Sequence, residues 1–247
     1  MVDDDSNCYR TAVEDDEQTV TSSRADRLKH GIAVPAPTLI GGFALLVIVT
    51  VWLSVLSAGP GVLAVDLTVA RFVQNHPFLG SHAIAVFGNT IGTAKVGVPL
   101  GLGIAAIFAW HGRPRAAYLM VAATGLRLVD GLLKLIVDSP RPSANLVHVN
   151  ESASGLGFPS GHVMSATLLC GALLLALWSK TDRRGRILLS TVATLIVLAT
   201  AYGRVSVGAH WPSDTLGGAL WAVILLALPA ARYSGVFPTR DGTPRAK

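Results

Sequence analysis

Six long apolar stretches constrain this chain more than any other feature, because a helix of about 20 apolar residues crosses the roughly 30 Å hydrocarbon core of a membrane. They cover residues 38–58, 94–110, 116–137, 162–178, 187–202 and 215–231. A further apolar segment, 78–91, is broken by Gly88 and Asn89 and is predicted to be an interfacial or re-entrant piece leading into the second span. The pattern therefore predicts an all-α, polytopic membrane protein with a bundle of six transmembrane helices.

The composition agrees with a membrane protein that carries polar tails. Only 14% of the residues are charged, whereas soluble domains carry about 25%. Residues 1–36 differ, because clusters of Asp and Glu mixed with Ser and Thr cannot bury enough apolar surface to offset the entropy of ordering. We therefore expect a disordered, acidic cytoplasmic tail at 1–36, the six-span domain at 37–232 and a second cytoplasmic tail at 233–247. No apolar run follows the initiator closely enough to predict a signal peptide.

Lysine and arginine predict the orientation of the spans. They gather before the first span, between the second and third, between the fourth and fifth, and after the sixth. With six spans these four segments share one side of the membrane, which the positive-inside rule assigns to the cytoplasm. We expect a multi-pass protein of the plasma membrane with both termini inside. The net charge of +5 then reflects topology, and we expect no nucleic-acid partner.

The loops predicted on the outer face hold three short polar blocks. Their chemistry-bearing residues are Lys134 and Arg141, then Ser160, Gly161 and His162, then Arg204, His210 and Asp214. The predicted topology places all three blocks at one membrane depth, where they can build a single site.

The first block supplies two cations across a predicted helix end. Pro140 and Pro142 stiffen the exit by fixing their own φ angles, and Arg141 and Lys134 can converge on one anion as a planar fork and a point charge. The ordinary alternative is that Lys134 snorkels to the interface and Arg141 is a loop charge.

The second block stands where the fourth span begins. Backbone N–H groups at a helix N-terminus attract anions, Ser160 adds a hydroxyl donor, Gly161 permits close approach and His162 can supply a proton. The ordinary alternative is a helix cap made by Ser160, with His162 at a wet interface.

The third block pairs an imidazole with a carboxylate. Arg204 can clamp a phosphate, and Asp214, four residues after His210, can hold the imidazole in one tautomer and stabilise its cation. An imidazole oriented in this way can attack phosphorus. The ordinary alternative is that Asp214 caps the sixth span and His210 packs beside Trp211.

Together the blocks resemble the type 2 phosphatidic acid phosphatase superfamily, to which the vanadium haloperoxidases are related. The family pattern is Lys-x6-Arg-Pro, Pro-Ser-Gly-His and Ser-Arg-x5-His-x3-Asp, and this chain departs from it at Gly203, where the family usually has Ser. The resemblance covers residues 38–231, and the departure puts one hydrogen bond to the phosphate in doubt.

The resemblance implies a metal-independent, cofactor-free lipid phosphate phosphatase with an outward-facing site. His210 would be the nucleophile that forms a phosphohistidine, Asp214 would orient it, and His162 would act as general acid and then base. The phosphate would be bound by Lys134, Arg141, Ser160, Gly161 and Arg204. The expected substrates and partners are lipids: a phosphatidate-type lipid, or a polyprenyl diphosphate such as undecaprenyl diphosphate.

Two other functions are alternatives to this interpretation. A membrane anion transporter or binding protein without hydrolysis explains the cations but not the pairing of His210 with Asp214. A vanadium haloperoxidase is disfavoured because those proteins are soluble.

Two further expectations concern the surroundings of the site. Helical spacing places Arg127, Asp130 and Lys134 on one face, and we hypothesise that Asp130 bridges the two cations. The Ser/Asn/Gly-rich loop 143–158, which includes His148, is expected to control access of the head group.

Overall fold

The computed structural model describes residues 36–59, 61–151 and 154–234 of the chain. The chain divides into two units, Met1–Ala44 and Leu45–Lys247, and of the first unit the structure describes only residues 36–44, the start of the first helix. The predicted tails at 1–36 and 233–247 lie outside the described residues except for Ala36, Tyr233 and Ser234.

All regular secondary structure in the described residues is helical, which confirms the predicted all-α class. The helices are α2 (Ala36–Ser57), α3 (Ala64–Asn75), α4 (Ser81–Gly92), α5 (Ala94–Trp110), α6 (Pro114–Leu126), α7 (Val129–Val137), α8 (Gly161–Trp178), α9 (Arg183–Ser206) and α10 (Pro212–Ser234). Four of them, α2, α8, α9 and α10, are long and apolar enough to cross a membrane. The pair α4 and α5, bent by 63°, makes a fifth candidate if it counts as one span. The chain is therefore a multi-pass membrane protein.

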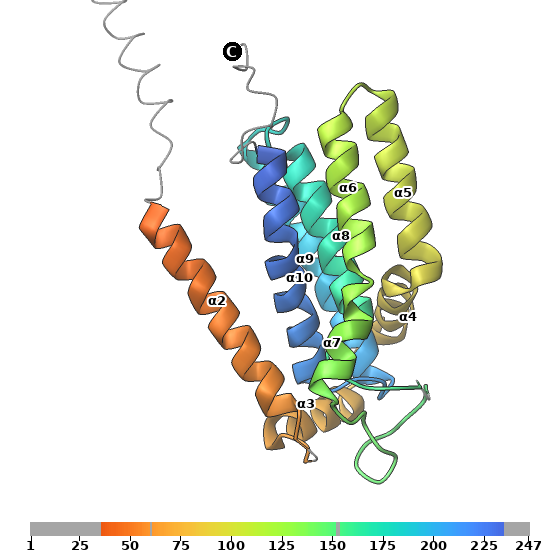
Figure 1. The fold of residues 1–247 in the computed structure, drawn as a ribbon. Coiled ribbons are helices and arrows are strands. Elements are labelled where there is room, and N and C mark those ends of the chain that lie inside the picture. Colours follow the sequence, from red (N-terminus) through yellow and green to blue (C-terminus); the bar gives the residue numbers. More distant parts are fainter. Residues whose placement is uncertain (1–35, 60, 152–153, 235–247) are drawn as a thin grey trace, which may run out of the picture. The chain divides into compact units, whose positions relative to one another are not determined.

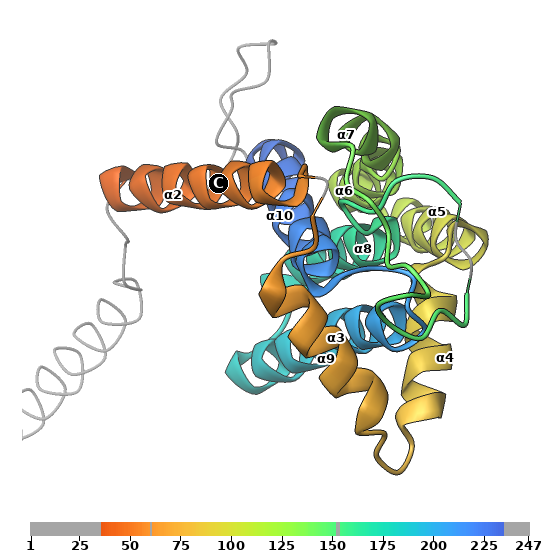
Figure 2. The same ribbon diagram turned by 90° about the horizontal axis from the view of Figure 1, so that it is seen from below.

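The predicted third span, 116–137, is not one continuous helix. It is divided at Arg127 and Leu128 into α6 and α7, which follow one another in nearly the same direction (Figure 1, Figure 2). At the break the backbone tightens, since Leu128 N–H donates to the carbonyl of Gly125 at 3.0 Å and Asp130 N–H to that of Arg127 at 3.1 Å. These three-residue bonds replace the α-helical pattern, and the break falls at Arg127, the first charged residue of the predicted span.

The segment 78–91 forms α4, which packs on α9 with almost no space between the backbones. A Cβ added to Gly88 would collide with the carbonyl of Ala199, and one added to Gly203 would lie 2.7 Å from the carbonyl of Ala85. Glycine at both contact points lets the two helices approach closely. The sharp bend that follows α4 agrees with the predicted re-entrant piece.

Helix α8 lies among α5, α6, α9 and α10 (Figure 2). Its inner side chains, among them Met164, Leu168 and Ala172, are fully buried. Large apolar side chains on the outside of the bundle are exposed instead, with Leu128 at 80% and Leu135 at 75%, as expected for surfaces that contact lipid.

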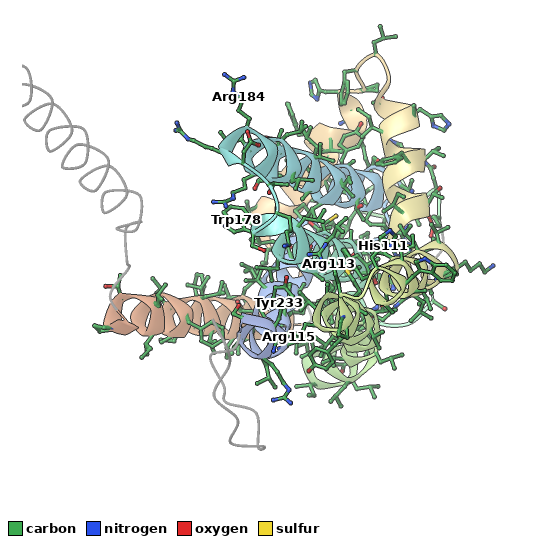
Figure 3. The ribbon with its side chains drawn as sticks, turned by 90° about the horizontal axis from the view of Figure 1, so that it is seen from above. His111, Arg113, Arg115, Trp178, Arg184 and Tyr233 are labelled. Carbon is green, nitrogen blue, oxygen red and sulfur yellow. The ribbon has the colours of Figure 1, made fainter. Side chains whose placement is uncertain are left out.

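The two ends of the bundle differ in chemistry. Figure 3 views the end at the top of Figure 1, which carries Arg113, Arg115 and Arg184 with Trp178 and Tyr233. The C-terminal end of α7, the start of α8, the end of α9 and the start of α10 meet at the opposite end (Figure 1). The chain order of these helices thus brings the three polar blocks together.

Candidate active site

A pocket of about 440 Å³ lies where the three polar blocks meet. It is lined by Thr93, Ala94, Lys95, Arg127, Asp130, Lys134, Arg141, Glu151, Gly161, His162, Arg204 and His210. Six of the eight predicted site residues are in this lining. The other two, Ser160 and Asp214, are fully buried beside it. The structure therefore gathers residues that are up to 80 positions apart in the sequence.

His210 is held at both nitrogens of its imidazole ring. Its Nδ1 lies 3.2 Å from Asp214 Oδ2, and its Nε2 lies 3.2 Å from Nη1 of Arg141. Arginine can only donate hydrogen bonds, so Nε2 must be the acceptor and Nδ1 must carry the hydrogen that points to Asp214. The predicted orientation of His210 by Asp214 is thus matched by the contacts, and the lone pair of Nε2 faces Arg141, which lines the pocket.

The surroundings of His210 also keep its ring uncharged. The side chain is only 2% exposed. Burial lowers its pKa well below the ordinary value, and the positive charges of Arg141 and Arg204 lower it further. The imidazole is therefore neutral at pH 7, which is the form that can act as a nucleophile.

Asp214 has a second structural task at the start of α10. Its Oδ2 also accepts a hydrogen bond of 2.9 Å from the backbone N–H of Trp211, reaching back over Pro212 at the first helical position. Its backbone carbonyl accepts a bond of 2.9 Å from Ser160 N–H. Asp214, the third residue of α10, thus contacts both His210 and the N–H that precedes the helix, and its carbonyl joins the second block to the third.

The two cations of the first block are fixed by different means. Lys134 Nζ donates to Asp130 Oδ2 at 2.8 Å, so it points into the pocket and is not a snorkelling interface lysine. Helix α7 ends at Asp138, which adopts the left-handed conformation with φ 51°. Beyond this turn Arg141 donates from Nε to the carbonyl of Gly155 at 2.9 Å and from Nη1 to that of Ala209 at 2.7 Å.

The hypothesis that Asp130 bridges two cations is only half right. Among the described residues Asp130 pairs with Lys134 alone. Within the same part of the chain, Nη1 of Arg127 and Oδ1 of Asp130 are buried without a hydrogen-bond partner. Shared helical spacing puts the three residues on one face but does not decide which pair forms.

The interpretation of Ser160 as a helix cap is wrong. Ser160 occupies the N-cap position of α8, but its side chain makes no capping hydrogen bond. Its Oγ is fully buried and has no partner among the described residues. The hydroxyl hydrogen of Ser160 is therefore not used to cap α8 and can be donated to another group.

Gly161 and His162 shape the wall of the pocket at the start of α8. A Cβ on Gly161 would lie 2.5 Å from Oδ2 of Asp130, so only glycine leaves room for the carboxylate that holds Lys134. The Cβ of His162 would lie 2.7 Å from a Cβ on Gly92, which places the ring beside the bend between α4 and α5. No described residue forms a hydrogen bond with this ring.

Arg204 is held by two residues that sequence reasoning missed. The guanidinium, 2% exposed, donates to both carboxylate oxygens of Glu151 at 3.0 to 3.1 Å and to Oδ1 of Asn89 at 3.3 Å. Burial alone would raise the pKa of Glu151, but the hydrogen bonds and charge of Arg204 lower it, so the carboxylate is ionised. The sequence held one signal for each residue: Glu151 is the single acid of the polar loop 143–158, and Asn89 is an amide that interrupts the apolar segment 78–91.

The loop 143–158, apart from residues 152–153, which lie outside the described ranges, is tied to the site. Asn150 N–H donates to Val207 carbonyl at 2.9 Å and Gly157 N–H to Ser139 carbonyl at 2.8 Å. His148 does not line the pocket, and its backbone N–H donates to Gln74 Oε1 at 3.0 Å. The loop's contribution to the site therefore comes from Glu151 and backbone carbonyls.

The departure at Gly203 has a steric cause. A Cβ there would lie 2.7 Å from the carbonyl of Ala85 and 2.9 Å from Oδ1 of Asn89. Serine does not fit against α4 at this distance. Asn89, which contacts Arg204, stands beside the place that a serine side chain would take.

Comparison with known proteins agrees with this geometry. Residues 115–234, which contain all three blocks, match the model of the PAP2 superfamily, so the predicted resemblance to the type 2 phosphatidic acid phosphatases is confirmed. The fold is similar to the crystal structure of the first transmembrane PAP2 type phosphatidylglycerolphosphate phosphatase from Bacillus subtilis. The TM-score is 0.68 at 19% sequence identity, over 80% of this chain and 98% of that chain. No curated protein matches the sequence.

Proposed function

We propose that this chain, a member of the PAP2 superfamily, is an integral membrane lipid phosphate phosphatase that acts through a phosphohistidine intermediate. The observation that carries the proposal is the setting of His210: a neutral ring, with Nδ1–H directed to Asp214 and the lone pair of Nε2 facing Arg141, one of the cations that line the pocket. A neutral imidazole with one nitrogen held by a carboxylate is a competent nucleophile.

The reaction takes two steps. In the first, Nε2 of His210 bonds to phosphorus, the bond from phosphorus to the leaving oxygen breaks, and protonated His162 gives that oxygen its proton. In the second, neutral His162 takes a proton from water, the water oxygen attacks the phosphohistidine, and inorganic phosphate leaves with His210 restored. Asp214 stabilises the positive charge that the ring carries between the two steps.

The other site residues bind the phosphoryl oxygens, and charge stabilisation of this kind supplies most of the catalysis in phosphoryl transfer. Lys134, Arg141 and Arg204 contribute positive charge, and the unpartnered Oγ of Ser160 and the N–H of Gly161 contribute donors at the start of α8. Because three cations and a helix N-terminus supply the charge that a divalent metal would bring, we propose that the reaction proceeds without metal or cofactor.

The membrane setting completes the proposal. We propose that α6 and α7 cross together as the third of six spans, with the arginine-rich end of Figure 3 in the cytoplasm and the pocket at the outer face of the plasma membrane. An outward-facing pocket of this kind meets lipid head groups directly. The candidate substrates are a phosphatidate-type lipid, a polyprenyl diphosphate, and phosphatidylglycerophosphate, since the similar protein from Bacillus subtilis is named as a phosphatase of that last lipid.

The test is release of inorganic phosphate by the protein purified in detergent with a chelator present. Phosphatidate, phosphatidylglycerophosphate and undecaprenyl diphosphate are offered separately. We expect release from at least one, and expect His210→Ala to abolish it. The matched control is Arg115→Gln, which removes a cation from the opposite end of the bundle (Figure 3) and should retain full activity.

Three results would contradict the proposal. They are strict dependence on an added metal, full activity in the His210→Ala variant, and binding of lipid phosphates without hydrolysis. The last result would favour an anion transporter or binding protein.

A further inference from the structure

Two cations in the pocket have no part in the proposed mechanism. Lys95 and Arg127 line the same cavity as His210 and His162. Among the described residues neither forms an ion pair, and Nη1 of Arg127 is buried without a hydrogen-bond partner. A buried guanidinium nitrogen with no partner is costly, which points to a ligand that supplies the missing acceptor.

Lys95 in α5 and Arg127 at the C-terminal end of α6 lie at similar depths in the bundle. Helices α5 and α6 run antiparallel and pack side by side (Figure 1, Figure 2). A Cβ on Gly101 of α5 would collide with the side chain of Thr124 of α6. From this contact Lys95 lies six residues along α5 and Arg127 three residues along α6 toward the same end of the bundle, a difference of about 4.5 Å along the axis. Lys134 occupies Oδ2 of Asp130, and among the described residues neither Lys95 nor Arg127 is paired with a carboxylate.

The leaving group would depart toward the part of the pocket near Lys95. In-line attack by His210 drives the leaving group away from Nε2 and toward His162, the proposed acid. His162 packs against Gly92, the last residue of α4, and Lys95 follows three positions later. Arg141, in contrast, contacts Nε2 itself and lies on the attacking side.

The helices on either side of Arg127 also have an outer surface that faces lipid. Leu128, which directly follows Arg127, and Leu132 on α7 are 80% and 58% exposed, so the bundle presents an apolar outer surface beside Arg127. A lipid substrate with its tail along that surface would place the part of its head group nearest the tail beside Arg127.

We propose that Lys95 and Arg127 form a second anion subsite for head groups that bear two phosphate groups. The terminal phosphate is attacked by His210, and the phosphate nearer the tail is bound by the two cations. In a polyprenyl diphosphate the second group is the departing lipid monophosphate; in a phosphatidylglycerophosphate it is the phosphodiester. This inference rests on the proposed function and names its substrate class.

The test compares kcat/KM on matched substrates that differ in the second phosphate. The pairs are farnesyl diphosphate with farnesyl monophosphate, and phosphatidylglycerophosphate with phosphatidate. Each charge-assisted hydrogen bond lost should lower kcat/KM on the two-phosphate member by about 10- to 100-fold in Arg127→Gln and Lys95→Gln, chiefly through KM. The monophosphate members should change by less than about threefold. Arg127→Lys should recover part of the selective loss, and Arg115→Gln should have no effect.

A binding measurement keeps the inference separate from the proposed function. Thermal stabilisation of the protein by inorganic diphosphate is compared with stabilisation by inorganic phosphate. We expect Arg127→Gln to remove the advantage of diphosphate. Wild-type protein that hydrolyses no lipid but retains this difference would overturn the proposed function and leave the subsite standing. Equal losses on both members of each pair, or no loss on either, would overturn the subsite.

Discussion

The substitution Asp214→Asn separates the charge of this residue from its structural tasks. In the structure Oδ2 accepts hydrogen bonds from His210 at 3.2 Å and from the backbone N–H of Trp211 at 2.9 Å. Among the described residues, Oδ1 has no partner. An asparagine with its carbonyl oxygen in place of Oδ2 keeps both bonds and puts its amide nitrogen where no bond exists. The tautomer of His210 and the start of α10 are retained, and only the negative charge is lost.

The distance sets the size of the expected effect. A full positive charge on His210 at 3.2 Å from the carboxylate is stabilised by about 5 kcal/mol at an effective dielectric constant of about 20. The ring carries only part of that charge in the transition state, so we expect formation of the phosphohistidine to slow on the order of 10³-fold. The thermal midpoint should stay within about 2 °C of wild type.

Single-turnover phosphate release and thermal unfolding in detergent measure these two quantities side by side. Asp214→Ala is the comparison, because it removes the charge and also the bond to Trp211, whose loss should lower the midpoint by about 2–4 °C. If Asp214→Asn keeps activity within about threefold of wild type, Asp214 is only a helix cap and the proposed mechanism is refuted.

Three further perturbations test other parts of the site. Burial and neighbouring cations lower the pKa of His210, so the folded protein binds fewer protons than the unfolded chain. Stability should therefore fall by up to about 1.4 kcal/mol per pH unit below about pH 6.5; thermal midpoints from pH 7.5 to 5 should show a smaller fall in His210→Gln, and identical falls would contradict the neutral ring. Restoring the family residue with Gly203→Ser should lower kcat and the thermal midpoint, since the new Cβ lies 2.7 Å from the Ala85 carbonyl; a gain in activity would show that the helices can separate freely. Glu151→Gln should strengthen inhibition by inorganic phosphate about three- to tenfold, because phosphate no longer competes with an ionised carboxylate for Arg204; an unchanged inhibition constant would show that phosphate does not bind there.

Local signals were sufficient for the chemistry-bearing residues. The pairing of His210 with Asp214 follows from a four-residue spacing at a helix start, and the glycine at 161 from its place in a short motif beside a helix N-terminus. Such features depend on neighbours in the chain, so the sequence displays them directly. The same reasoning failed where two local outcomes were equally allowed, as for the cap by Ser160 and the partner of Asp130.

The residues around Arg204 could not be predicted in this way. Asn89 and Glu151 lie 115 and 53 positions from it, and they reach it only because α4 packs directly against α9 and the loop before α8 folds back over the pocket. Whether two distant segments touch depends on the close fit of whole helices, as at Gly88 and Gly203. The spacing of residues along the sequence does not predict such contacts.

The sequence by itself therefore determined that the chain is helical and apolar, and that three polar blocks carry two histidines, a carboxylate and a set of cations. Only the tertiary structure decided how those groups are held. It divided the third apolar stretch at Arg127, left that guanidinium without a partner in the described pocket, and placed a carboxylate on Arg204. Side-chain identity is fixed residue by residue, whereas the pairing of buried charges is fixed by which helix faces meet.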